Sequence, residues 1–212
     1  MGLIRVHHLN HSRSQRILWL LEEIGLDYEI ITYKRDAKTN LAPPDLLAVH
    51  PLGKSPMIEM DGVLIAESGA IVEAICAVHA PQMVPEAGSE SHIRHLEAMH
   101  FAEGSVMLPV LLALYTSRLG EGAAPLQPRI QEQLDSHFSF MEASLRESGH
   151  FVMDDLSAAD VMMSFPAQVA VRQGRAGDFP KLAAFCDMIH EREAWKRSIE
   201  RSKDAGAGYW SF

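Results

Sequence analysis

Apolar and polar positions follow two distinct periodicities in the first third of the chain, and each predicts a different kind of element. Residues 3–8 (LIRVHH) and 28–33 (YEIITY) are short apolar runs typical of strands. Between them Ile17, Leu21 and Ile24 recur at the spacing of one helical face. A strand, a helix and a second strand within this length predict a βαβ unit with two parallel strands.

The next fifty residues predict a connector, a hairpin and a helix. Pro43-Pro44 opens a short helical or irregular stretch, and MIEM and VLIA then flank Asp61-Gly62. Asp-Gly between two apolar runs is the strongest short hairpin signal. A helix is expected from Ser68 onward. The order β-α-β-α-β-β-α predicts an α/β domain around one four-stranded mixed sheet.

Strand signals stop after a stretch rich in proline and glycine (APQMVPEAGSE), which predicts a linker. Beyond it every periodic segment is helical. The expected helices are residues 90–120 with a kink at Pro109, a helix opened by Pro128 and reaching Gly149, residues 157–172, a helix opened by Pro180, and residues 193–202. We therefore expect an α/β domain over residues 1–80, a linker over 81–90 and an all-α domain over 91–212.

Composition narrows the possible partners and compartment. The 212-residue chain is 47% apolar and 22% charged, which is typical of a globular protein. Its net charge of −9 and the lack of a basic block argue against nucleic acid. No apolar run reaches the roughly 18 residues of a membrane span, and the N-terminus lacks the pattern of a signal peptide. With two cysteines, Cys76 and Cys186, the cytoplasm is the expected location.

Two serines lie where helices are expected to begin. Ser12 fits the N-cap position of a helix that Gly25 would end. Its hydroxyl, beside a helix N-terminus, could also bind an anion. Ser157 and Asp160 have the spacing of a capping box, so a structural role is expected there.

Two further segments offer ligand chemistry. Pro56 follows a glycine-containing loop and precedes a strand; base rates favour a trans Ser55-Pro56 bond, whereas a cis bond would turn the backbone of Met57 toward an extended ligand. Ser68 could cap its helix or bind a carboxylate, and Glu67 beside it could meet an ammonium group. An α-amino-acid head group carries both charges.

Metal binding and several common catalytic devices find no support. Neighbouring residues of a strand point to opposite faces, so His7 and His8 cannot easily share an ion. His92 and His95 could share one, but no third ligand lies at a suitable spacing. The chain has no serine nucleophile elbow, no P-loop and no Cys-x-x-Cys motif. No metal is expected.

Four segments together resemble the soluble glutathione transferases over the whole chain. They are HHLNHSRSQRILWLLEEIGLDYEI, HPLGKSPMIEMDGVLIAESGAIVEAI, FAEGSVMLP and FVMDDLSAADVMM. The third is similar to a bacterial and fungal subgroup, and the N-terminal motif is of the serine type. In the fourth, Asp154 stands where the family often has glycine.

The resemblance implies a thioredoxin-like domain that binds glutathione, a helical domain and a homodimer. It implies a cis Ser55-Pro56 bond and a glutathione-binding role for both residues. It also implies contact of Met57 with the cysteinyl part of glutathione, and contact of Glu67 and Ser68 with its γ-glutamyl head. Lys54, with Lys38 or Asn40, would reach a carboxylate of the tripeptide. The co-substrate would be an electrophilic, largely apolar small molecule bound near Met107, Leu111, Tyr115, Trp210 and Phe212, as in detoxification.

The family classes use Tyr, Ser or Cys near the end of the first strand, and residues 3–20 contain neither Tyr nor Cys. Ser12 is the expected catalytic hydroxyl, with Asn10 as a second donor to sulfur, and Ser14 and His11 stay open as alternatives. Two other functions also stay open. One is a glutathione-dependent peroxidase, dehalogenase or isomerase, and the other is a regulator that binds glutathione or a protein without turnover.

Overall fold

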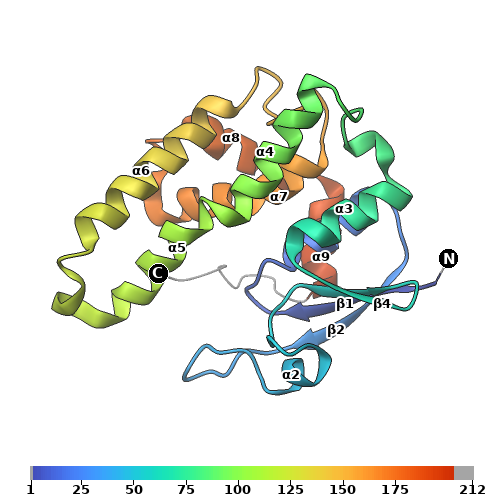
Figure 1. Cartoon of the computed structure of the whole chain (residues 1–212), viewed down its shortest axis with the longest axis horizontal. Coiled ribbons are helices and arrows are strands. Elements are labelled where there is room, and N and C mark those ends of the chain that lie inside the picture. Colours follow the sequence, from blue (N-terminus) through green and yellow to red (C-terminus); the bar gives the residue numbers. More distant parts are fainter. Residues whose placement is uncertain (1, 203–212) are drawn as a thin grey trace. The chain divides into compact units, whose positions relative to one another are not determined.

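The computed structural model describes residues 2–202, which form two compact units. The first combines the described residues up to Pro81 with residues 190–202, and the second spans Gln82–Ile189. The strands are β1 Ile4–Leu9, β2 Tyr28–Tyr33, β3 Met57–Met60 and β4 Val63–Ala66. The helices are α1 Gln15–Glu23, α2 Asp45–Val49, α3 Ser68–His79, α4 Glu90–Gly104, α5 Met107–Thr116, α6 Gln127–Ser144, α7 Ala158–Ala170, α8 Pro180–Glu191 and α9 Glu193–Ser202 (Figure 1).

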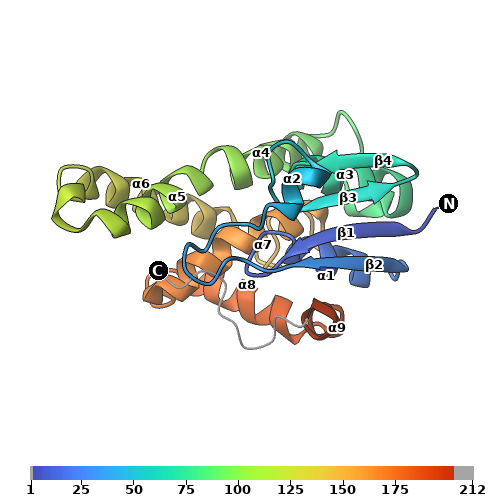
Figure 2. The same cartoon turned by 90° about the horizontal axis from the view of Figure 1, so that it is seen from below.

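The first unit is built on a four-stranded sheet in the order β2-β1-β3-β4 (Figure 2). β1 and β2 are parallel, while β3 is antiparallel to both β1 and β4. Helices α1 and α3 pack against the strands and each other. On β1, Leu9 faces a separate buried cluster with Leu46 of α2 and Met57 of β3. The predicted mixed sheet and its element order are confirmed.

Local turn chemistry explains the hairpin. Asp61 and Gly62 have φ angles of 50° and 82°, the positive pair that a type I′ turn requires. The two residues close β3 onto β4 with Met60 opposite Val63. The hairpin predicted from Asp-Gly is therefore confirmed.

Neither serine expected to cap a helix in the first unit is the N-cap residue of that helix. Helix α1 begins at Gln15 with Ser14 as its N-cap, and Ser12 lies in the preceding turn. Helix α3 begins at Ser68 itself, and its N-cap is Glu67, which makes no side-chain capping bond. The N-cap predictions for Ser12 and Ser68 are thus wrong, because the first helical hydrogen bonds are accepted by the carbonyls of Ser14 and Glu67. Gly25 does follow α1 in a left-handed conformation (φ 68°), as its predicted role requires.

The long helix predicted over residues 90–120 is interrupted between α4 and α5. The break covers Ser105 and Val106, rather than Pro109 itself. A proline ring clashes with the carbonyl four residues earlier, and for Pro109 that residue is Ser105. Pro109 then lies in the first turn of α5, where its missing N–H is not needed.

The remaining helices of the second unit follow the prediction closely, with one difference. α6 ends at Ser144 instead of near Gly149, because Leu145 is extended and Arg146–Gly149 form a turn. Ser157 and Asp160 form the predicted capping box of α7. α8 begins at Pro180 as predicted.

The stretch Glu90–Ala123 is long and apolar enough to cross a membrane by length and composition alone. Core helices of soluble proteins can be equally long and apolar, and α4 packs against α7 within its unit. The stretch is also divided at Ser105 and carries Arg94 and Glu97 as an exposed ion pair. We assign it to the helical unit.

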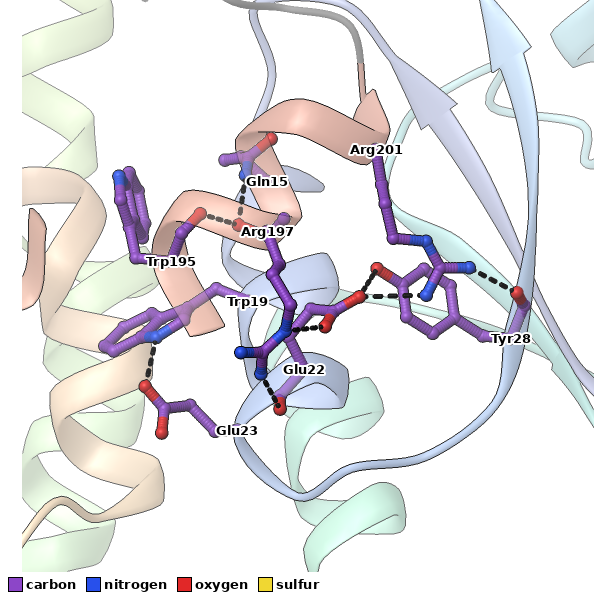
Figure 3. Close-up of polar contacts among 9 residues, drawn as sticks. Gln15, Trp19, Glu22, Glu23, Tyr28, Trp195, Arg197 and Arg201 are labelled. Atoms are coloured by element: carbon purple, nitrogen blue, oxygen red, sulfur yellow. Dashed lines mark hydrogen bonds and ion pairs between the residues drawn. The ribbon is translucent and has the colours of Figure 1, made fainter. Parts of the chain in front are cut away.

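The last helix packs against the first. Trp19 of α1 and Trp195 of α9 meet edge to face at 5.5 Å, and Gln15 donates to Ser198 at 2.7 Å (Figure 3). The sequence-based division at residues 81–90 grouped α9 with the helical domain; by its contacts it belongs with the first unit. Periodicity along one segment shows which face is apolar but not which distant segment covers it.

Glu22 is the polar centre of this α1–α9 contact (Figure 3). Its carboxylate accepts from Arg197 and Arg201 of α9 and from the Tyr28 hydroxyl, each at 2.8 Å. Burial by itself raises the pKa of Glu22, but the hydrogen bonds from Arg197, Tyr28 and Arg201 outweigh it and the net shift is downward. The folded state therefore favours the charged carboxylate.

Replacing Glu22 by Gln is expected to lower the free energy of unfolding by about 1–2 kcal/mol at neutral pH, since charged acceptors form the stronger bonds. Because the folded pKa lies below the ordinary value of 4.5, this stabilisation is complete above that value and is lost as the pH falls below it. Urea unfolding at several pH values should show the difference between wild type and variant closing in acid. Glu132→Gln, in an exposed pair with Arg129, is the control and should change little.

Candidate functional site

The turn between β1 and α1 holds the candidate catalytic side chains and is fixed by Arg35. The Arg35 guanidinium donates to the carbonyls of Asn10 at 3.1 Å, His11 at 3.3 Å and Asn40 at 3.0 Å. The Arg35 backbone N–H donates to Asn10 Oδ1 at 2.8 Å. Because an N–H must donate to an oxygen, this bond determines which end of the Asn10 side-chain amide is Oδ1. The other end of this half-buried amide is the NH2 group, which can act as a donor.

Ser12 follows His11, which has a left-handed backbone conformation with φ 53°. The Ser12 side chain is only 3% exposed. Its Oγ lies 2.7 Å from Ser14 Oγ and 3.5 Å from Ser55 Oγ, and it accepts from the Ser14 backbone N–H at 3.3 Å. Ser12 is therefore in contact with the segment that contains Pro56.

The segment before β3 has the geometry that the resemblance implied. The Ser55-Pro56 peptide is cis, so the base-rate expectation of a trans bond is wrong. Gly53 has φ 55°, which favours glycine, and a Cβ there would lie 2.8 Å from Leu47 Cδ2, so the Leu47 side chain would have to shift for a larger residue. Ser55 Oγ donates to the His7 carbonyl at 2.8 Å and accepts from the Leu9 N–H at 3.2 Å. These bonds tie the segment to the end of β1.

The strand register determines where the backbone of Met57 points. Met60 and Val63 close a two-residue hairpin and form a hydrogen-bonded pair, so bonding toward β4 alternates from there. Met57 consequently directs its N–H and C=O toward His7 of β1. Ser55 precedes the ladder, and its backbone groups lie outside it.

Glu67 and Ser68 lie at the N-terminus of α3. Glu67 is exposed and has φ 68° and ψ 122°, a conformation that L-residues rarely adopt. Ser68 is 4% exposed and is the first helical residue. The first backbone N–H groups of a helix have no partner within it and favour an anion, so a carboxylate fits here.

The other candidate side chains are scattered. Lys54, Lys38 and Asn40 are exposed in the first unit. In the second unit Met107 is buried, Leu111 is half-buried and Tyr115 is 59% exposed. Trp210 and Phe212 lie outside the described residues.

Neither cysteine is suited to thiol chemistry. Cys76 and Cys186 are free and buried, and burial raises the pKa of each thiol to about 12. Among residues 2–202 no group of three or more His, Cys, Asp or Glu side chains could hold a metal ion. His7 and His8 do point to opposite faces, since His7 contacts Tyr33 and Glu59 while His8 contacts Ser14.

Sequence reasoning missed two residues that shape this site. Arg35 carries no local signal, because its contacts with this site are to the carbonyls of Asn10 and His11, about 25 residues earlier. His8 also went unnoticed as a partner of Ser14, although the alternation of β1 does place it on the face opposite His7. Only the tertiary contacts distinguish them from ordinary polar residues.

A four-stranded sheet with a cis-proline before its third strand, joined to a helical unit, defines a thioredoxin-like domain followed by an α-helical domain. Residues 1–75 match the family model "Glutathione S-transferase, N-terminal domain", and residues 99–193 match "Glutathione S-transferase, C-terminal domain". The chain belongs to the glutathione S-transferase family.

Individual relatives agree over nearly the full length. Glutathione S-transferase 1 of Saccharomyces cerevisiae is 30% identical, with 99% of each chain covered. Glutathione S-transferase 3 of Schizosaccharomyces pombe is 30% identical over 95% of this chain and 89% of its own. A glutathione S-transferase structure from Actinobacillus pleuropneumoniae superposes with a TM-score of 0.86 at 29% identity, over 95% of this chain and 93% of that one. The protein is a glutathione S-transferase that uses glutathione as co-substrate.

Proposed function

We propose that Ser12 activates glutathione by donating a hydrogen bond to its sulfur, which stabilises the thiolate, and that Asn10 supplies a second donor. The observation that carries this proposal is the 3.5 Å contact between Ser12 Oγ and Ser55 Oγ, beside the cis peptide. It joins the candidate hydroxyl to the segment suited to an extended peptide ligand. The orientation of the Asn10 amide supports its donor role.

The γ-glutamyl head would bind at the N-terminus of α3. Its carboxylate would accept from the Ser68 hydroxyl and from the first N–H groups of the helix, and its ammonium would pair with Glu67. The uncommon backbone of Glu67 supports this, since such conformations cluster at ligand sites.

The cysteinyl part would pair with backbone at the cis-proline segment. Of the predicted binding residues, Ser55 suits this contact better than Met57, because the backbone of Met57 is engaged with β1 whereas Ser55 lies before the ladder. Lys54, helped by Lys38 or Asn40, would meet the remaining carboxylate; all three are exposed.

The free energy of one hydrogen bond is large enough to stabilise the thiolate at neutral pH. A free thiol has a pKa of about 8.5, so only a few per cent is thiolate at neutral pH. Lowering the pKa by about two units needs roughly 2.7 kcal/mol, and one hydrogen bond to a charged group supplies about 1.5–3 kcal/mol. The thiolate then attacks an electrophilic carbon of a largely apolar co-substrate, a reaction suited to detoxification. Met107, Leu111 and Tyr115 are candidate acceptor residues.

Calorimetric titration with reduced glutathione tests the ligand site. Wild type is expected to bind in the micromolar to low millimolar range, and Ser68→Ala to bind about tenfold or more weakly, because a hydrogen bond to a charged carboxylate is lost. Ser91→Ala, on the exposed side of α4, is the matched control. Unchanged affinity of Ser68→Ala would contradict the assignment of the γ-glutamyl site.

We also propose that the enzyme is a cytoplasmic homodimer. The helical unit has an apolar groove of about 750 Å³ between α4 and α6, lined in part by Phe101, Phe140 and Phe151. Phe140 is 56% exposed there, and a second copy would cover it. Sedimentation analysis tests the dimer, and a monomer at micromolar concentration would contradict it.

The cytoplasmic location is supported by the cysteines. Cys76 and Cys186 are free and buried, which suits a reducing compartment.

A further inference from the structure

Three buried polar side chains form a continuous hydrogen-bonded series between β1 and the turn before α1. His8 Nδ1 lies 2.8 Å from Ser14 Oγ, and Ser14 Oγ lies 2.7 Å from Ser12 Oγ. His8 and Ser14 are fully buried and Ser12 is 3% exposed. Water therefore has little access to these contacts, and their geometry is set by the protein.

The hydrogens of this series can be assigned by counting donors. Each serine hydroxyl carries one hydrogen. That of Ser55 is used for the His7 carbonyl at 2.8 Å, so only Ser12 can donate in the long Ser12–Ser55 contact. Ser12 Oγ already accepts from the Ser14 backbone N–H. The direction of the Ser12 hydroxyl hydrogen therefore depends on Ser14.

Ser14 in turn depends on His8. If Nδ1 of His8 carries a hydrogen, it donates to Ser14, Ser14 donates to Ser12, and the hydrogen of Ser12 is available to a ligand. If Nδ1 lacks a hydrogen, Ser14 donates to His8 and Ser12 donates to Ser14, which turns its hydrogen away from the ligand. The alternative acceptor for Ser14, the Leu9 carbonyl, is 3.4 Å away and much weaker.

We propose that His8 is a positioning residue which, with a hydrogen on Nδ1, acts through Ser14 to hold the Ser12 hydroxyl as a donor to the glutathione sulfur. This rests on the proposed role of Ser12. No proton is transferred along the series, and the thiol proton leaves to solvent. A hydroxyl that accepts hydrogen bonds while donating one is also a stronger donor, because the bonds polarise one another.

Variants of His8 test the proposal through the bound thiol. His8→Leu removes the Nδ1 donor, whereas in His8→Asn the side-chain amide N–H replaces it. The ultraviolet absorbance of bound thiolate is recorded against pH for both variants, with Ser12→Ala as reference. The apparent pKa of the bound thiol is expected to rise by about one unit in His8→Leu, a tenfold smaller thiolate fraction at neutral pH. In His8→Asn most of that rise should be reversed, while glutathione affinity changes less than a few fold in both.

The outcomes distinguish failure of the proposed role of Ser12 from failure of the proposed role of His8. If Ser12→Ala leaves the thiol pKa unchanged, the proposed role of Ser12 fails first. If Ser12→Ala raises it but His8→Leu does not, or if His8→Asn behaves as His8→Leu does, the role of His8 is overturned. Adding His8→Leu to Ser12→Ala should raise the pKa no further, since both act through one hydroxyl.

Nitrogen NMR of wild type with bound glutathione provides a test that needs no variant and so does not depend on variant folding. The proposal requires His8 to carry a hydrogen on Nδ1 in this complex. A tautomer with its only hydrogen on Nε2 would overturn it.

Discussion

Replacement of Ser12 by alanine is expected to lower kcat/KM for conjugation by about 10- to 150-fold near neutral pH. This range corresponds to the loss of one hydrogen bond to a charged group, about 1.5–3 kcal/mol. Glutathione affinity should stay within a few fold, because the variant leaves the proposed contacts of the γ-glutamyl head and the cysteinyl backbone in place. Steady-state kinetics with a broad electrophile and calorimetry measure the two quantities separately.

The pH dependence sharpens this test. As the pH rises past about 8.5, free thiols ionise without help, so the difference between wild type and Ser12→Ala should shrink. A deficit that stays constant up to high pH would indicate damage to the site rather than loss of thiolate stabilisation. Ser91→Ala, exposed on α4, should match wild type throughout. Unchanged turnover of Ser12→Ala near neutral pH would refute its catalytic role.

Replacement of Asp160 by alanine is expected to lower the free energy of unfolding by about 3–5 kcal/mol, the largest stability effect we expect. The Asp160 carboxylate is fully buried and accepts three hydrogen bonds. They come from the Phe151 N–H at 2.8 Å, the Ser157 N–H at 2.7 Å and the Ser157 hydroxyl at 2.7 Å. Removing it leaves two buried backbone donors unpaired and α7 without its capping box.

Urea unfolding followed by circular dichroism measures this effect. Asp154→Ala is the matched control, because Asp154 lies in the same loop but is 77% exposed in its pair with Arg146. The control should cost less than about 1 kcal/mol. A similar loss in both variants would mean that the loop, rather than the buried carboxylate, determines stability. Since small domains have about 5–15 kcal/mol in total, Asp160→Ala should also lower the yield of folded protein.

The sequence could predict the order of the elements because their signals are local. The Asp61-Gly62 turn, Gly25 after α1 and the capping box before α7 each depend on residues within one turn of chain. Pro109 is instructive, since the helix break falls at Ser105, the residue whose carbonyl the proline ring displaces. The sequence predicted an interruption caused by Pro109, and the four-residue hydrogen-bond spacing of a helix explains why it falls at Ser105.

The site was predictable as a set of segments but not as a set of contacts. The segments around Ser12, Pro56 and Ser68 were identified from their motifs. Which backbone each segment engages depends on strand register, which directs the N–H and C=O of Met57 toward His7. Register is a relation between strands, so no single strand encodes it.

The sequence by itself determined the fold class, the helical second half and the residue types available for thiol chemistry, because periodicity, turn residues and caps act over a few positions. Only the tertiary structure decided that α9 packs on α1, that Arg35 fixes the turn carrying Asn10, and that His8 reaches Ser12 through Ser14. These are contacts between residues that the fold brings together. Their energies depend on burial and on distances of about 3 Å, which no local pattern specifies.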